Sequence, residues 1–231
     1  MPILKMLSGG AANGLINAVR ESFKTSSSCD IVGEFGAVGG MFDRVVTGES
    51  VDVVILSKKL IQELASLDLL IPETCCDLGE VVTGFAIPSG CIAPTLDTTD
   101  TVRNALLNSE AIYTADVKKA TAGIHFHSVL AKLGIVANVE QSLRIFPNGQ
   151  TAMAAMAKNR EPSALGCTQI TEILNTPGVD WVAPLPEGLD LTTTYSAGIS
   201  KSSKSEALAL ELLSLLTSSK INETRKNVGF S

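Results

Sequence analysis

The sequence predicts an α/β protein of two lobes, each a mixed sheet flanked by helices, joined by two hinge strands. First, short apolar runs alternate with small-residue turns and amphipathic helices, which is typical of βα units around a mainly parallel sheet. Second, two extended segments, 80–90 and 192–203, are rich in β-branched residues and have no helix directly behind the strand. Third, the 231 residues of the chain are enough for one large α/β domain or two small lobes.

The first part of the chain repeats the strand and helix pattern three times. Each apolar run is short enough for a strand, and each following segment has the apolar spacing of a helix. The strand and helix pairs are 3–7 with 15–23, 30–35 with 41–48, and 51–57 with 58–70.

The second part continues the pattern and defines the lobes. AIYTAD (111–116) precedes a turn and a helix that holds both histidines, and 161–174 reads as a strand, a turn and a helix. The final helix, 205–218, returns to the first lobe. The expected organisation is therefore lobe one at 1–80 plus 200–231, lobe two at 85–195, and hinge strands near 81–87 and 194–199, with a ligand cleft between the lobes.

Composition excludes several classes of protein. The formal net charge is −6, and no run of Lys and Arg forms the basic surface that nucleic acid requires. No stretch reaches the ~20 apolar residues of a membrane span, so no membrane insertion is expected. The odd set of five cysteines lacks the spacing of a disulfide framework. Without a basic leader, the chain is expected to be cytoplasmic as given, and periplasmic if a leader has been removed.

The only two histidines lie in TAGIHFHSVLAKLG (121–134). Phe126, Val129, Leu130 and Leu133 recur at helical spacing, and Thr121 is the predicted N-cap. On a helix, His125 and His127 lie about 200° apart and cannot chelate one ion. We therefore expect no metal site, and we expect His127 to be a packed, hydrogen-bonded residue.

Three loops of small residues precede helices, at 8–13, 36–40 and 121–123. In open α/β sheets, ligands bind beyond the carboxyl ends of the strands, where helix N-termini present free N–H groups and partial positive charge. No loop has a nucleotide-binding pattern, so a compact anion is expected and no cofactor. The alternative is that small residues only allow close packing. The predicted ligand contacts in these loops are Ser8, Gly9, Gly10, Ala11, Ala37, Val38, Gly39, Gly40, Thr121, Ala122 and Gly123.

Two cations are further candidates for ligand contacts. Arg44 follows the second loop and could bind a carboxylate with both arms of its guanidinium. Lys58 follows the strand 51–57 and could attract an anion to the cleft. The alternative for each is a solvated surface residue.

Four segments, 7–23, 34–64, 120–135 and 143–174, resemble the molybdate-binding periplasmic proteins in order and spacing. The most specific match is a Gly-rich loop, a helix, G-x-x-x-D and an apolar strand, which ends in Gly48–Leu56. The resemblance implies the type 2 periplasmic-binding-protein fold. It also implies ligand contacts from five segments, which adds Asn148 and Gln169 to the predicted site.

At the matched positions Ala11, Gly39 and Gln169, this chain lacks the hydroxyls of that family. The change suits a larger, planar carboxylate, and bacterial aconitate isomerases resemble the same group. We therefore expect a di- or tricarboxylate ligand, isomerised by a cofactor-free allylic proton shift with His125 as base. The alternative for His125 is a surface or rim residue. The alternative function is a non-catalytic solute-binding protein for a molybdate-like oxyanion or small organic anion, with an ABC permease as partner.

Overall fold

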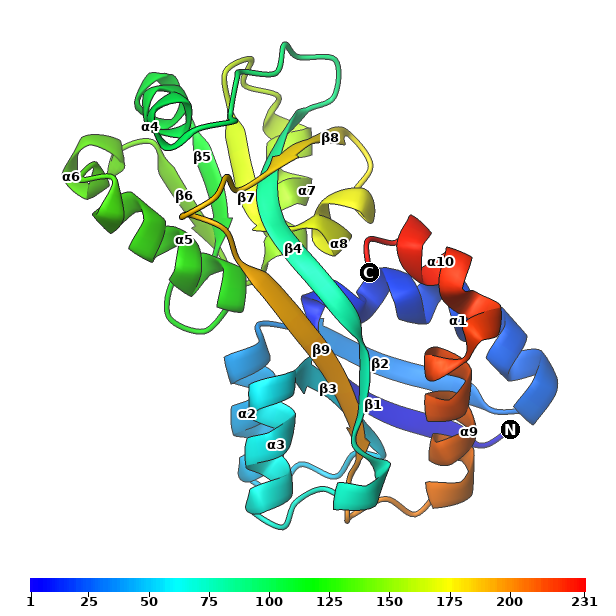
Figure 1. Cartoon of the computed structure of the whole chain (residues 1–231). Helices are drawn as coiled ribbons and strands as arrows, with labels where there is room; N and C mark the ends of the chain where they lie inside the picture. Colours follow the sequence, from blue (N-terminus) through cyan, green and yellow to red (C-terminus); the bar gives the residue numbers. More distant parts are fainter. The chain divides into compact units, whose positions relative to one another are not determined.

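The computed structural model describes residues 1–231 and divides into two compact units (Figure 1). Unit 1 comprises Met1–Val81 and Thr193–Ser231, and unit 2 comprises Val82–Thr192. The chain enters unit 2 within strand β4 (Cys76–Pro88) and returns at the start of strand β9 (Thr192–Ile199). The predicted α/β class with two lobes is confirmed.

Unit 1 contains a five-stranded mixed sheet in the order β2-β1-β3-β9-β4. Strands β1, β2 and β3 are parallel, and β9 runs antiparallel to β3. Figure 1 shows α2 and α3 on one face of this sheet and α1 and α9 on the other. The bounds are β1 Ile3–Gly9, β2 Asp30–Gly36, β3 Val53–Ser57, α1 Asn13–Ser27, α2 Val38–Val46, α3 Lys58–Ser66, α9 Glu206–Thr217 and α10 Asn222–Asn227.

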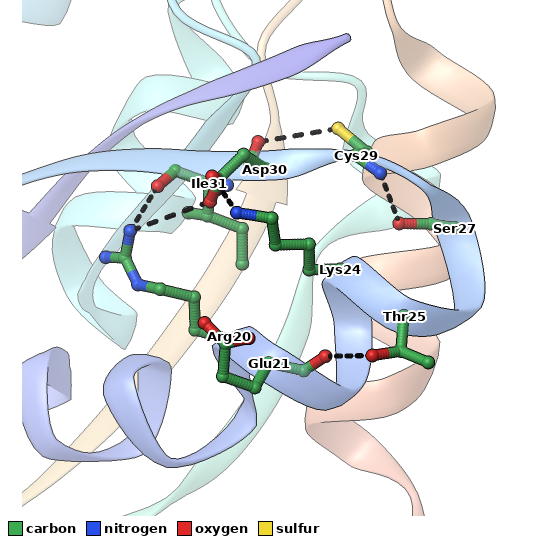
Figure 2. Close-up of polar contacts among 8 residues, drawn as sticks. All are labelled: Arg20, Glu21, Lys24, Thr25, Ser27, Cys29, Asp30 and Ile31. Carbon is green, nitrogen blue, oxygen red and sulfur yellow. Dashed lines mark hydrogen bonds and ion pairs between the residues drawn. The ribbon is translucent and has the colours of Figure 1, made fainter. Parts of the chain in front are cut away.

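At the turn from α1 to β2, polar contacts connect the end of the helix to the start of the strand (Figure 2). Ser28 adopts a left-handed backbone conformation with φ 55°, which ends the helix. The Lys24 ammonium then pairs with the Asp30 carboxylate at 2.8 Å, and Arg20 donates to the Ile31 carbonyl at 2.5 Å. Lys24 lowers the pKa of Asp30 through this hydrogen bond. These contacts hold the amino end of β2, which leaves the carboxyl ends of the strands as the edge where loops can bind a ligand.

Unit 2 contains the remaining part of β4 and four further strands. Strands β5, β6 and β7 are parallel, and β4 runs antiparallel to both β7 and β8. None of the helices in the chain has the length and apolarity that crossing a bilayer requires. The bounds are β5 Ile112–Ala115, β6 Leu143–Phe146, β7 Leu165–Gln169, β8 Val179–Pro184, α4 Thr99–Asn108, α5 Thr121–Lys132, α6 Val136–Val139, α7 Gly149–Asn159 and α8 Ile170–Leu174.

Successive side chains along a strand point to opposite faces of the sheet, so the hydrophobic core of unit 2 has one part on each face. Ile112 belongs to a cluster with Phe126 and Val129 of α5, whereas its neighbour Tyr113 belongs to a cluster with Met153 of α7. Phe126 also meets Phe85 of β4 edge to face, with ring centroids 6.3 Å apart. The helices α5 and α7 thus cover opposite faces, and both begin at the edge where the parallel strands end.

Candidate functional site

Helix α5 begins with free backbone donors. Its N-cap, Ala120, has an extended backbone and supplies no side-chain hydrogen bond. The N–H of Ile124 is the first that is accepted, by the Ala120 carbonyl at 2.9 Å. The N–H groups of Thr121, Ala122 and Gly123 have no acceptor, and Ala122 and Gly123 are buried. The three residues that the sequence indicated therefore form an uncapped helix start with positive partial charge.

The predicted cap at Thr121 is wrong by one residue. The Asp116 carboxylate accepts the N–H groups of Lys118 and Lys119, at 2.7 and 3.0 Å, and holds a turn that ends at Ala120. Thr121 is consequently the first residue of the helix. A Cβ on Gly123 would lie 2.4 Å from the carbonyl oxygens of Ala115 and Asp116. Gly123 is needed because the helix start lies directly against the end of β5.

The two histidines of α5 have different surroundings. His125 is half-buried, and its Nε2 lies 2.7 Å from the Leu189 carbonyl oxygen. Because a carbonyl only accepts, Nε2 carries the proton, and the lone pair of the neutral ring lies on Nδ1. His127 is exposed, so the prediction that it packs was wrong: the buried face of α5 passes through Ala122, Phe126 and Leu130 instead. No group of three or more His, Cys, Asp and Glu side chains could hold a metal ion.

Helix α7 begins in the opposite way, with its donors satisfied. Asn148 is the N-cap, and its side chain accepts the Thr151 N–H at 2.9 Å while Thr151 Oγ1 accepts the Asn148 N–H at 3.3 Å. This is a capping box. The side-chain oxygen of Asn148, predicted as a ligand contact, is thus used inside the protein, and the N-G-Q-T spacing was a signal for it.

The Glu172 carboxyl group also lies against the start of α7. A Cβ on Gly149 would come within 2.0 Å of Glu172 Oε2, and Thr168 Oγ1 donates to Oε2 at 2.5 Å. Burial raises the pKa of Glu172, while hydrogen bonds from Thr168 and from the backbone of Gln150, Gly149 and Gln169 act to lower it. An internal acidic group therefore takes the place at α7 that an external anion could take at α5.

Gln169 lies at the carboxyl end of β7, 2% exposed, with Thr83 of β4 directly across the strand pair. The hydroxyl oxygens of Thr83 and of Thr171, in the first turn of α8, are buried and have no hydrogen-bond partner. Sequence analysis missed both threonines. Thr83 was read only as part of a linking strand, and nothing local indicates that it lies across from Gln169.

In unit 1, the two predicted loops adjoin each other. Strands β1 and β2 end in register at Gly9 and Gly36. A Cβ on Gly9 would lie 2.7 Å from Val38 Cγ1 and 3.1 Å from Tyr195 Cε1, which places the first loop against the start of α2 and against β9. Tyr195 is a neighbour of the loop that sequence analysis did not identify.

Backbone groups dominate these two loops. Residues Gly10–Ala12 form a short 3-10 helix before α1, and α2 begins after Ala37 without a side-chain cap. The N–H groups of Val38, Gly39 and Gly40 have no acceptor, since Met41 is the first residue to donate back, to Ala37, at 3.1 Å. The Ser8 hydroxyl is buried and donates to the Gly9 carbonyl at 2.9 Å.

The predicted ligand cations have partners within unit 1. Arg44 binds the Glu49 carboxylate through Nε and Nη2, at 2.6 and 2.5 Å, and contacts Glu34 at 2.8 Å. Arg44 lowers the pKa of both glutamates. Lys58 pairs with Asp77 at 2.6 Å, and this pairing lowers the pKa of Asp77. The structure thus assigns both cations to carboxylates of the chain.

Comparisons with known proteins extend over most of the chain. The family model of the bacterial extracellular solute-binding proteins matches residues 4–231. An aconitate isomerase of a Pseudomonas species is 24% identical over 224 residues, 93% of this chain and 82% of that protein. The periplasmic molybdate-binding protein of Azotobacter vinelandii superposes with a TM-score of 0.80 at 18% identity, over 99% of this chain and 98% of that one. A sulfate-binding protein of Mycobacterium tuberculosis gives 0.77 at 14% identity, over 100% and 86%.

Proposed function

Because this chain belongs to the bacterial extracellular solute-binding protein family and has the type 2 periplasmic-binding-protein fold, we propose that it binds a small di- or tricarboxylate and isomerises it. The observation that carries the binding proposal is the start of α5. Three consecutive N–H groups there have neither a side-chain cap nor another acceptor. Such donors, with the positive end of the helix dipole, favour an anion.

Unit 1 supplies a second set of donors for the proposal. The start of α2 has three unaccepted N–H groups, and the glycine-rich end of β1 lies beside it. These N–H groups also favour an anion, because they lie at the positive end of a helix and no side chain caps them.

A carboxylate suits the chemistry of these loops better than a tetrahedral oxyanion. Ala11 and Gly39 present no side-chain hydroxyl, and Gln169 offers an amide that can both donate and accept. A planar ligand with several carboxylates can be held by separate backbone donors without a dense shell of hydroxyls. The relative that is named an aconitate isomerase supports the same ligand class.

The proposed reaction is an allylic proton shift between cis- and trans-aconitate. A base removes a proton from the methylene carbon, the C–H electron pair forms the new double bond, and the electrons of the old double bond take up a proton at its far carbon. His125 is the proposed base. Its Nε2–H is held by the Leu189 carbonyl, so Nδ1 is the ring nitrogen that can accept the proton.

The experiment follows the reaction by proton NMR in deuterated buffer, starting from cis-aconitate. We expect trans-aconitate to form and solvent deuterium to enter the methylene. His125→Gln should reduce turnover by about a thousandfold, within the range for loss of a general base, while calorimetry still detects binding. His127→Gln is the matched control, since His127 is exposed on the same helix, and it should retain turnover. Equal turnover in the wild type and His125→Gln would remove His125 from the mechanism.

Binding without turnover is the second candidate, and one observation favours it. The hydrogen bond from His125 to Leu189 explains the histidine as a link between α5 and the loop after β8, with no chemistry required. Under this candidate the chain acts outside the cytoplasm with an ABC permease as partner. Absence of turnover, together with a large thermal shift from molybdate or tungstate, would select it.

A further inference from the structure

The buried threonine hydroxyls of unit 2 fall into two groups, those with a hydrogen-bond acceptor and those with no partner. The hydroxyl of Thr114 donates to the Cys167 carbonyl at 3.2 Å, and that of Thr176 donates to the Glu172 carbonyl at 2.7 Å. Thr168 donates to the Glu172 carboxyl group. The hydroxyls of Thr83 and Thr171 have no partner, although each residue is only 1% exposed. A buried hydroxyl without a partner destabilises the protein, because its hydrogen bonds to water are lost without replacement.

Both of these residues adjoin Gln169, one across the sheet and the other along the chain. Thr83 is paired with Gln169 across β4 and β7, and directly opposed residues of an antiparallel pair have side chains on the same face, with Cβ atoms about 5 Å apart. Thr171 follows Gln169 by two residues, in the first turn of α8. The backbone of Thr83 is fixed on both sides, since its N–H donates to Leu191 and its carbonyl accepts from Leu185.

From this arrangement we propose that Thr83 and Thr171 donate their hydroxyl protons to a carboxylate group of the ligand, beside Gln169. The inference rests on the proposed function, and it assigns two specificity-determining contacts within unit 2. They supply hydroxyl donors from β4 and α8, whereas Ala11 and Gly39 supply none. The Glu172 carboxyl group does not compete for them, because it is directed at Thr168 and the start of α7.

The test replaces each threonine by valine, which keeps the shape and removes the hydroxyl. In the ligand-free protein, Thr83→Val and Thr171→Val should leave the melting temperature unchanged or slightly higher, because an unpartnered polar atom is replaced by a methyl group. In calorimetry with trans-aconitate, each variant should bind about tenfold more weakly, which corresponds to about 1.4 kcal/mol.

Thr114→Val is the matched control. Its hydroxyl is buried in the same sheet but has an internal acceptor, so this variant should melt at a lower temperature and bind trans-aconitate as the wild type does. A lower melting temperature for Thr83→Val and Thr171→Val with unchanged affinity would overturn the inference. That result would mean that the two hydroxyls serve the fold alone, for instance through bound water.

Titrations of the wild type with trans-aconitate and molybdate distinguish failure of this inference from failure of the proposed function. If the wild type binds trans-aconitate and both valine variants bind it equally well, the threonine assignment is wrong while the proposed function stands. If the wild type binds molybdate and no trans-aconitate, the carboxylate proposal is wrong. Molybdate titrations of both variants with unchanged affinity would then overturn the threonine contacts as well.

Discussion

The helices α5 and α7 begin at the same edge of the unit 2 sheet, yet their first turns differ in every polar contact. The start of α7 has a capping box from Asn148 and Thr151, and the Glu172 carboxyl group lies against Gly149. The start of α5 has Ala120 as its cap and no acceptor for its first three N–H groups. Both helices cover the same sheet, so the need to pack a helix does not explain the difference.

We interpret this difference as one between a helix start that stabilises the fold and a helix start that the proposed function uses. Capping by a polar side chain stabilises a helix by about 1 kcal/mol, and α7 has that contribution together with a buried acidic group. The start of α5 lacks it at a place where Ser, Thr, Asp or Asn at position 120 would supply it. Departures from such local rules concentrate at functional sites. The contrast therefore favours α5 as the anion-binding helix of unit 2.

The largest expected effect comes from making the start of α7 resemble that of α5. Glu172→Ala removes the carboxyl group and leaves Thr168 Oγ1 and nearby backbone donors without their acceptor, so we expect a loss of about 3 kcal/mol in the free energy of unfolding. Urea denaturation followed by circular dichroism measures it. A loss below about 1 kcal/mol would mean that α7 does not depend on Glu172, and the comparison between the two helices would fail.

A smaller, pH-dependent effect sharpens the role of Glu172. Burial raises its pKa in the folded state, so the folded protein binds more protons than the unfolded chain between the two pKa values. Its contribution to stability is therefore fully present below the unfolded value and declines as the pH rises through the folded pKa. Glu172→Gln cannot titrate. We expect the stability of the wild type relative to Glu172→Gln to decrease as the pH increases above about 4.5, near the ordinary value for Glu.

Denaturation curves of both proteins across a pH series give this difference directly. The ion-paired carboxylates Asp30, Glu34 and Asp77 have lowered pKa values and act in the opposite direction, but they are common to both proteins and their effects cancel. A relative stability that increases with pH would show that hydrogen bonds, rather than burial, dominate at Glu172.

The fold could be predicted from the sequence because the spacing of apolar residues distinguishes strands from helices. The runs 3–7, 30–35 and 51–57 correspond to the strands β1, β2 and β3 in the structure, and the segments after them are helices. The glycine- and alanine-rich turns also mark the ends of β1 and β2 and the start of α5. These features depend on residues that are close in sequence, so they can be recognised from the order of residue types alone.

Contacts between distant residues were not predictable in this way. Glu172 lies in the apolar run ITEIL, and its approach to Gly149 depends on how β7 and α7 are placed. The position of Thr83 across from Gln169 likewise depends on the pairing of β4 with β7. The Thr121 cap failed for a local reason, since Asp116 organises the preceding turn. The partners of Arg44 were partly readable, because Glu49 follows it by five residues.

The most direct measurement of the central claim adds to α5 the cap that α7 already has. Ala120→Ser places a hydroxyl oxygen where it can accept the N–H of Ala122 or Gly123, so we expect the free energy of unfolding to rise by about 1 kcal/mol and trans-aconitate to bind about tenfold more weakly in calorimetry. Ala120→Cys, of similar size but with a poor acceptor, should change both quantities less. An Ala120→Ser protein that is more stable and binds trans-aconitate with unchanged affinity would contradict the assignment of the anion to the start of α5.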